Sequence, residues 1–219
     1  VISGKGDSFS AGIDITMFMS DMNLNENLSS TPQDRRQLMD LVERMQGAFT
    51  TIAKSKVPTI ALAHGFCIGG ATSLVSACDI RLATKDAKFS IGETKLGLVA
   101  DVGVIQRMPK TVSSGDMNEL ALTGRIFDGE HAERIRFVNK AYENSDELFE
   151  AGKKLANEIS SNSKRIVQAT KEALEKSSNL TVDQGLEYAK LWSTSFLISE
   201  DLREGVMAFL EKRDPKFNE

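Results

Sequence analysis

Apolar residues in the first part of the chain gather in short runs, and glycine turns and helical patterns separate these runs. Residues 59–63 form a compact apolar run that is typical of a buried strand. Residues 1–2, 80–83 and 88–91 are further short runs of β-like composition. Strands that alternate with helical patterns in this way predict an α/β layer fold over residues 1–142.

Two helical patterns precede the central strands. Residues 13–22 are predicted to form a short helix, and the polar residues 23–30 a loop. A longer helix begins after Thr31, which can cap it, while Pro32 suits the first turn and Asp34 favours the positive end of the helix dipole. Apolar residues then recur three and four positions apart: Leu38, Leu41, Val42, Met45, Phe49 and Ile52.

The last part of the chain, residues 143–219, has a different pattern. Its apolar residues follow the helical period throughout, and four polar residues stand where helices are expected to begin. These are Ser145, Ser163, Thr181 and Ser199. The pattern predicts four consecutive helices, so the α/β part is followed by an all-helical region.

Composition narrows the class of protein. The chain has 219 residues, 41% of them hydrophobic and 26% charged, which is ordinary for a folded soluble protein. Its net charge of −4 argues against a general nucleic-acid binder. No apolar run approaches the roughly 18 residues that a membrane helix needs. The two cysteines, Cys67 and Cys78, fit neither a disulfide framework nor a zinc site, which favours a reducing compartment.

A glycine-rich turn over residues 63–71 is the strongest local signal for chemistry. A buried strand enters the turn, and Gly69, Gly70 and Ala71 then open a helix. Small side chains let a ligand approach the backbone, and N–H groups at a helix start can hold a phosphate or a developing oxyanion. The alternative is that the glycines only permit tight packing. The spacing matches neither a P-loop nor a dinucleotide fingerprint.

A second turn of small residues, 10–14, precedes the first helix. Two such turns in one domain can direct two backbone N–H groups at one carbonyl oxygen. That arrangement stabilises a thioester enolate without a metal or a nucleophile.

Two carboxylates, Glu93 and Asp101, lie eight residues apart in an apolar stretch that glycines interrupt. Burial would raise their pKa values toward the range useful for acid–base chemistry, whereas the alternative is surface charge on a loop. The apolar neighbours of Asp101 favour burial. His64 is interpreted as a strand-end histidine satisfied by the backbone, and no cluster of metal ligands or nucleophile elbow is present.

In this order and spacing, the three features resemble the crotonase superfamily of enoyl-CoA hydratases and isomerases, over essentially the whole chain. The most specific stretch is 60–80. Residues 10–14, 77–81, 99–103 and 106–110 look most like Δ3,5-Δ2,4-dienoyl-CoA isomerases. The resemblance implies a ClpP/crotonase-type ββα spiral core over 1–142, with its first strands missing, and a C-terminal helical trimerisation region over 143–219.

The resemblance also implies roles for individual residues. Glu93 falls on the catalytic glutamate that hydratases and isomerases share, and Asp101 on the second acid of dienoyl-CoA isomerases. Ser73 departs from the pattern, because relatives carry an aspartate or a glutamate there. The residues implied at the oxyanion hole and the substrate-binding surface are Ala11, Gly12, Ile13, Asp14, Gly70 and Ala71.

The function that follows is isomerisation of 3,5-dienoyl-CoA to 2,4-dienoyl-CoA through an oxyanion-stabilised dienolate. Serine at position 73 cannot activate water, which argues against efficient hydration. Two alternatives stay open: a Δ3-Δ2-enoyl-CoA isomerase or other hydratase-like enzyme, and a non-catalytic crotonase-like structural subunit.

The resemblance further implies no cofactor beyond the coenzyme A of the acyl-CoA substrate, and a homotrimer or hexamer. The expected compartment is the mitochondrial matrix or the bacterial cytoplasm, since residues 216–219 do not form a peroxisomal Ser-Lys-Leu signal.

Overall fold

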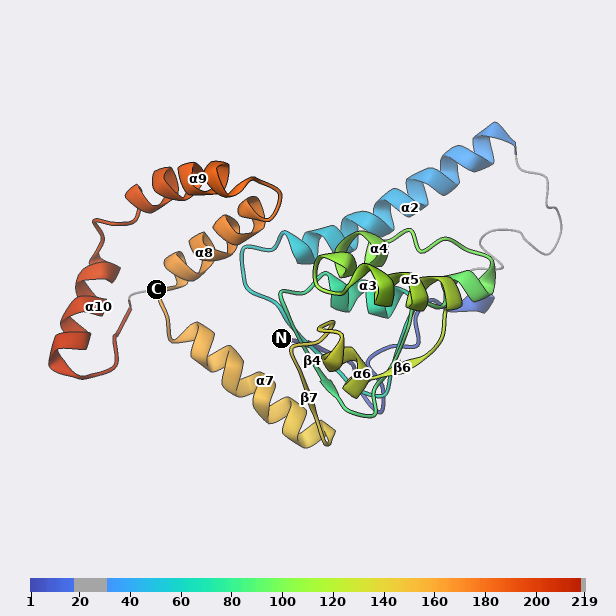
Figure 1. Ribbon diagram of the computed structural model, residues 1–219, viewed down its shortest axis with the longest axis horizontal. Helices are drawn as coiled ribbons and strands as arrows, with labels where there is room; N and C mark the ends of the chain where they lie inside the picture. Colours follow the sequence, from blue (N-terminus) through green and yellow to red (C-terminus); the bar gives the residue numbers. More distant parts are fainter. Residues whose placement is uncertain (18–30, 218–219) are drawn as a thin grey trace. The chain divides into compact units, whose positions relative to one another are not determined.

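The computed structural model describes residues 1–17 and 31–217 (Figure 1). The chain separates into two compact units, and the first comprises Val1–Ser55 and Thr59–Gly152. The second comprises Lys56–Pro58 and Lys153–Glu219. Of the helix expected over 13–22, only residues up to Met17 are described, and the expected loop over 23–30 lies outside the described residues.

Two sheets form the first unit. Sheet A has four parallel strands in the order β1 (Ile2–Ser3), β2 (Ile60–Ala63), β4 (Ile80–Thr84) and β7 (Lys140–Tyr142). Sheet B has β3 (Phe66–Ile68), β5 (Lys88–Ser90) and β6 (Phe127–Asp128), with β3 and β5 parallel and β6 antiparallel to β5. The chain therefore passes from β2 to β3 and again from β4 to β5, each time from sheet A to sheet B before helices follow.

The helices begin and end close to the signals in the sequence. Thr31 caps α2 with a complete capping box that includes Asp34, and Pro32 is its first residue. Ser163, Thr181 and Ser199 cap the last three helices, as predicted. The α-helices of the described residues are α2 (Pro32–Ala53), α3 (Gly70–Ser76), α4 (Val104–Arg107), α5 (Ser114–Thr123), α6 (Gly129–Arg134), α7 (Ser145–Ser160), α8 (Lys164–Ser177), α9 (Val182–Thr194) and α10 (Glu200–Glu211), and the 3₁₀ helices are η1 (Gly92–Leu96) and η2 (Met108–Lys110).

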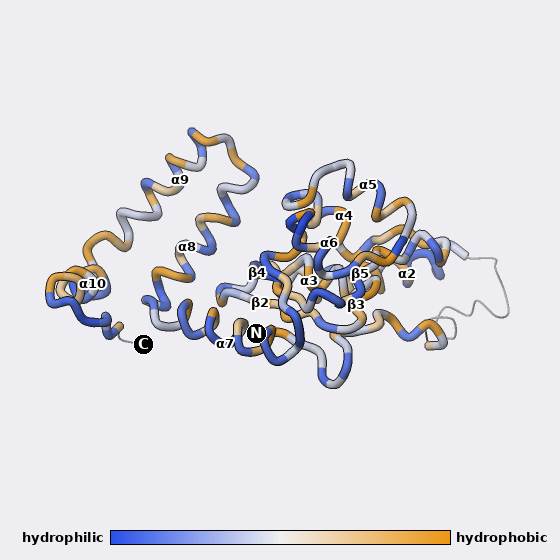
Figure 2. The backbone as a smooth tube through the Cα atoms, turned by 60° about the horizontal axis from the view of Figure 1, so that its bottom comes forward, coloured by the Kyte–Doolittle hydropathy of each residue, from blue (hydrophilic) through white to orange (hydrophobic). Residues whose placement is uncertain are grey.

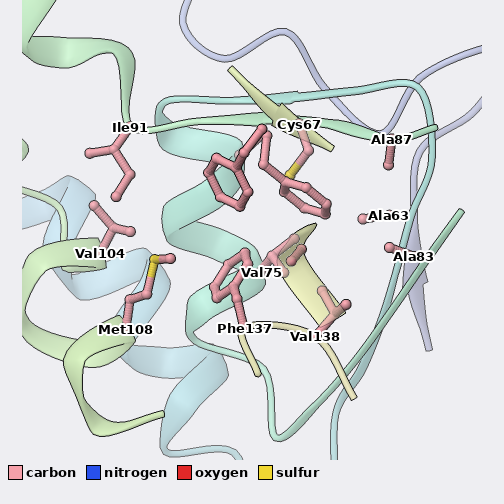
Figure 3. Close-up of a cluster of buried hydrophobic side chains, with 14 of the residues drawn as sticks. Ala63, Cys67, Val75, Ala83, Ala87, Ile91, Val104, Met108, Phe137 and Val138 are labelled. Atoms are coloured by element: carbon pink, nitrogen blue, oxygen red, sulfur yellow. The ribbon is translucent and has the colours of Figure 1, made fainter. Parts of the chain in front are cut away.

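The core of the first unit lies around the two sheets and α3 (Figure 3). Small residues such as Ala63 and Ala83 are fully buried on sheet A, which leaves room for aromatic rings. The ring of Phe89 lies 5.5 Å from those of Phe127 and Phe137, centre to centre. Because these residues come from β5, β6 and the segment before β7, their contacts tie distant parts of the chain together.

The α/β architecture of the first unit is confirmed, but the glycine turn is shorter than expected. Residues 66–68 form β3 instead of continuing the turn, because their backbone pairs with β5 twenty residues later in the chain. The first unit also extends beyond residue 142 into α7. A Cβ added to Gly152 would lie 2.6 Å from a methyl carbon of Leu62, so α7 packs directly against β2 at this glycine.

The second unit is built mainly from α8, α9 and α10. The indole Nε1 of Trp192 donates to the carbonyl oxygen of Ala169 at 2.9 Å, and its ring stacks on Tyr188 and meets Phe196 edge-on. Many apolar residues on these helices are nevertheless exposed. Figure 2 shows hydrophobic stretches along α8, α9 and α10. Across the part of the chain that the structure describes, no helix combines the length and the apolar character needed to cross a bilayer.

Candidate active site

The two turns of small residues lie side by side. Ser10 forms a parallel bridge with Cys67: its N–H donates to the carbonyl of Phe66 at 2.9 Å, and the N–H of Ile68 donates to its carbonyl at 3.1 Å. Gly12 follows with a φ of +94°, and a Cβ there would lie 2.7 Å from the carbonyl oxygen of Ile68. The same Cβ position is 3.9 Å from the amide nitrogen of Gly70. Glycine at position 12 thus permits both the turn and its contact with the start of α3.

The start of α3 directs backbone N–H groups at this junction. Gly69 precedes the helix with a φ of +57°, and its own N–H donates to the carbonyl of Ser90 at 2.9 Å. Gly70 and Ala71 are the first residues of the helix, where an N–H group has no acceptor within the helix itself. These two N–H groups are therefore suited to receive an acceptor from a ligand.

In the other turn, residues 10–14, one backbone N–H group already has an acceptor. The N–H of Gly12 donates to the hydroxyl of Ser10 at 3.2 Å. The carboxylate of Asp14 accepts from the N–H groups of Thr16 and Met17 at 2.9 and 3.1 Å. Asp14 thus caps the helical turn that begins after it. The neighbouring Ala11 and Ile13 are exposed.

Glu93 lies on η1 directly against this junction. A Cβ added to Gly69 would be 3.5 Å from its Oε1, so the absence of a side chain at position 69 makes room for the carboxylate. Its Oε2 is buried and has no hydrogen-bond partner among the described residues. Burial raises the pKa of Glu93 above its ordinary value of 4.5, and the negative charge of Asp101 raises it further.

Asp101 is exposed, so the burial expected from its apolar neighbours is wrong. The flanking Ala100 and Val102 are buried at 6% and 7% exposure. The apolar neighbours are therefore buried while the carboxylate between them is not. Its negative charge nevertheless contributes to the raised pKa of Glu93.

Ser73 lies on α3 one turn after Gly69, to whose carbonyl its N–H donates at 3.1 Å. The residue is fully buried. Within the described part of the chain its hydroxyl finds no hydrogen-bond partner. The position where relatives are expected to carry an acid thus holds a small neutral group in the core.

His64 is buried, and its Nε2 lies 2.9 Å from the carbonyl oxygen of Gly6, so the backbone satisfies this ring nitrogen as expected. Its Nδ1 has no hydrogen-bond partner among the described residues. Both cysteines are buried. Among residues 1–17 and 31–217, no group of three or more His, Cys, Asp or Glu side chains is arranged to hold a metal ion.

The side chains that hold the Asp101 loop are not marked by any pattern in the sequence. The amide Nε2 of Gln46 donates to the carbonyl oxygen of Asp101 at 2.7 Å. The guanidinium of Arg107 donates to the carbonyl of Val102 at 3.2 Å and to the hydroxyl of Thr50 at 3.0 Å. No local pattern marks Gln46 or Thr50, since each contacts a residue more than fifty positions away.

Comparison with known proteins gives one family. The family model "Enoyl-CoA hydratase/isomerase" matches residues 1–219. The mitochondrial Δ(3,5)-Δ(2,4)-dienoyl-CoA isomerase of Dictyostelium discoideum is 42% identical over 217 residues, which are 99% of this chain and 74% of the relative. The peroxisomal enzyme of the same name from Arabidopsis thaliana is 39% identical over 99% of this chain and 78% of its own.

The fold is shared with solved structures. The crystal structure of an enoyl-CoA hydratase from Bacillus anthracis superposes with a TM-score of 0.85 at 28% identity, covering 98% of this chain and 79% of that one. The expected crotonase-type core is therefore confirmed.

Proposed function

Since the chain belongs to the enoyl-CoA hydratase/isomerase family, we propose that it converts 3,5-dienoyl-CoA thioesters to 2,4-dienoyl-CoA thioesters. The proposal is supported by the names of relatives at about 40% identity. It is also supported by two acids, Glu93 and Asp101, whose charges interact.

The proposed reaction begins with the thioester carbonyl at the junction of the two turns. The N–H groups of Gly70 and Ala71, together with the turn at Ala11–Ile13, stabilise the negative oxygen that develops there. Glu93 takes the proton from C2, and the electron pair of the broken C–H bond spreads into a dienolate. Asp101 then delivers a proton to C6, and the double bonds move into the 2,4 arrangement. Each turnover leaves Glu93 protonated and Asp101 ionised, so Glu93 must give its proton to water and Asp101 must take one up before the next. The exposure of Asp101 gives it access to that water.

One observation carries the assignment of Glu93. Its carboxylate is partly buried, its Oε2 has no partner among the described residues, and its pKa is raised. A base with a raised pKa accepts a proton more readily near neutral pH. The same carboxylate lies against Gly69, next to the N–H groups that are proposed to hold the thioester oxygen.

Asp101→Asn tests the proposal directly. A proton moved from C2 to C6 spans a whole dienolate, which is too far for one short carboxylate, whereas a Δ3-Δ2 shift covers only C2 to C4. We expect Asp101→Asn to lower dienoyl isomerisation by about 10²-fold or more while sparing activity on 3-enoyl-CoA. The measurement offers 3,5-dienoyl-CoA, 3-enoyl-CoA and 2-enoyl-CoA in parallel and follows absorbance.

The outcomes separate the candidate functions. Equal loss of activity on 3,5-dienoyl-CoA and on 3-enoyl-CoA would indicate a structural role for Asp101. No loss on either would favour the second candidate, a Δ3-Δ2-enoyl-CoA isomerase that uses Glu93 alone, which the exposure of Asp101 supports. No turnover of any substrate by the unaltered protein would favour a non-catalytic subunit.

Hydration of 2-enoyl-CoA is expected to be negligible in the same assay. A hydratase needs two carboxylates around one water, and Ser73 contributes only a neutral, buried hydroxyl. Rapid hydration by the unaltered protein would contradict this reading of position 73.

We further propose that the chain assembles into a homotrimer or a hexamer through its helical region. The exposed apolar residues of α9 and α10 support this assembly. The mitochondrial location named for the Dictyostelium relative supports the mitochondrial matrix as the compartment.

A further inference from the structure

Helix α2 holds the loop that carries Asp101 directly at one carbonyl group, and through Arg107 at the next. Gln46 donates to the carbonyl oxygen of Asp101 at 2.7 Å. Thr50 accepts from the Nη2 of Arg107 at 3.0 Å, and the Nη1 of the same guanidinium donates to the carbonyl of Val102 at 3.2 Å. Gln46 and Thr50 are four residues apart in α2, so they lie one above the other on the same helix face.

Gly103 is shaped to this contact. Its φ is +118°, a conformation that favours glycine, and a Cβ there would lie 1.8 Å from the Nη1 of Arg107. The guanidinium of Arg107 therefore lies against the loop backbone, in the space that a side chain at position 103 would occupy. Arg107 is held from both sides, by the loop and by α2.

The other end of the loop is tied to the first acid. The N–H of Leu98 donates to the carbonyl oxygen of Glu93 at 3.0 Å. Between this bond and the contacts to α2, Ala100 and Val102 anchor the loop in the core, while the side chain of Asp101 is exposed. An exposed carboxylate receives little guidance from packing, so the position of its backbone decides where it can reach.

We propose that Gln46, Thr50 and Arg107 are positioning residues that hold Asp101 at the distance from Glu93 which the two-acid reaction requires. This inference rests on the proposed function of Asp101. It adds that these three residues determine the preference for dienoyl over 3-enoyl substrates. With these contacts in place the chain isomerises dienoyl thioesters. When these contacts are weakened, turnover of dienoyl thioesters falls, while the shorter proton shift that Glu93 performs alone is kept.

Matched pairs of variants test the inference. Gln46→Leu and Thr50→Val remove one hydrogen-bonding group each and nearly keep the shape of the side chain. Their controls are Gln37→Leu, an exposed position on the same helix, and Thr51→Val, whose hydroxyl donates only to the carbonyl of Gly47 within α2. For all four, kcat and KM are measured with 3,5-dienoyl-CoA and with 3-enoyl-CoA, and the melting temperature is recorded.

Both test variants are expected to lower kcat for 3,5-dienoyl-CoA by about fivefold, which is the typical effect of one hydrogen bond. KM for that substrate and kcat for 3-enoyl-CoA stay within about twofold, and the controls match the unaltered protein. Thr50→Ser, which keeps the hydroxyl, restores the dienoyl activity. A purely structural role would lower both activities together and would not produce this split.

Asp101→Asn, measured in parallel, distinguishes a failure of the positioning role from a failure of the proposed function. If Asp101→Asn is selective for the dienoyl substrate while Gln46→Leu and Thr50→Val leave both activities unchanged, or lower both equally, the positioning role is wrong and the proposed function stands. If Asp101→Asn itself shows no selectivity, the proposed function falls, and the positioning role falls with it.

Discussion

The carboxylate of Glu93 combines two properties that work against each other. A partly buried group without a hydrogen-bond partner among the described residues loses the solvation that water would provide. The resulting rise of its pKa makes it a better base, and it also makes the ionised form costly to the folded state. Catalytic potential and stability are thus opposed at this one residue.

The pH dependence of stability follows from that opposition. A carboxyl group whose folded pKa is raised binds its proton more tightly in the folded than in the unfolded state. Stability therefore falls as the pH rises through the ordinary value of 4.5 to the raised pKa, and the full cost persists above it. Below both pKa values the cost is absent.

Glu93→Gln removes the titration and is expected to be more stable than the unaltered protein at about pH 7, with no such advantage at about pH 4. Its turnover is expected to fall about 10²- to 10⁴-fold. Urea unfolding at several pH values measures the first effect, and the dienoyl assay measures the second. An advantage that is the same at every pH, or an unimpaired rate, would contradict the role of this residue.

At the scale of elements, the site depends on a turn that meets the start of a helix. Gly6 and Gly12 both have positive φ angles, of +86° and +94°, but only Gly12 approaches another backbone. A Cβ at position 6 has no heavy atom within 4 Å, whereas one at position 12 would be 2.7 Å from the carbonyl oxygen of Ile68. The two glycines therefore form a natural comparison.

Gly6→Ala is expected to lower the free energy of unfolding by about 1–2 kcal/mol through backbone strain alone, with unchanged activity. Gly12→Ala adds the contact with Ile68, so it should cost more stability and separate the turn from α3, with a loss of turnover. Thermal unfolding and the dienoyl assay distinguish the two variants. Similar behaviour of both would mean that the junction of the turns is not part of the site.

At the scale of the whole molecule, the second unit leaves several large apolar side chains exposed to water. On its helices and their connections, Val182 is 79% exposed, Ile198 98% and Phe209 83%. The stack of Tyr188, Trp192 and Phe196 uses only part of the apolar surface of α9. A self-associating protein buries such residues between copies of its own chain.

Phe209→Asp is expected to raise the protein concentration needed for assembly by about tenfold or more. The reason is that association would remove an unpaired charge from water. Met39→Asp is the control: Met39 is 72% exposed on α2 and belongs to the first unit. Sedimentation velocity over a range of protein concentrations measures the effect. A monomeric unaltered protein, or equal behaviour of both variants, would contradict assembly through the helical region.

The sequence by itself determined the features that depend on near neighbours in the chain. Thr31, Ser163, Thr181 and Ser199 cap their helices through bonds that reach only three residues ahead, so composition at the helix start was sufficient. The alternation of strands and helices and the two candidate acids, Glu93 and Asp101, could likewise be predicted from the local sequence pattern.

Only the tertiary structure decided what depends on distant pairing. β3 exists because β5 lies beside it, and the short strands β6 and β7 carry too few residues for any period to be read. Asp101 is exposed although its two neighbours are buried, and its loop is held by Gln46 from fifty-five positions away. Neighbours in space, which no local pattern records, set the burial and the hydrogen bonds of these residues.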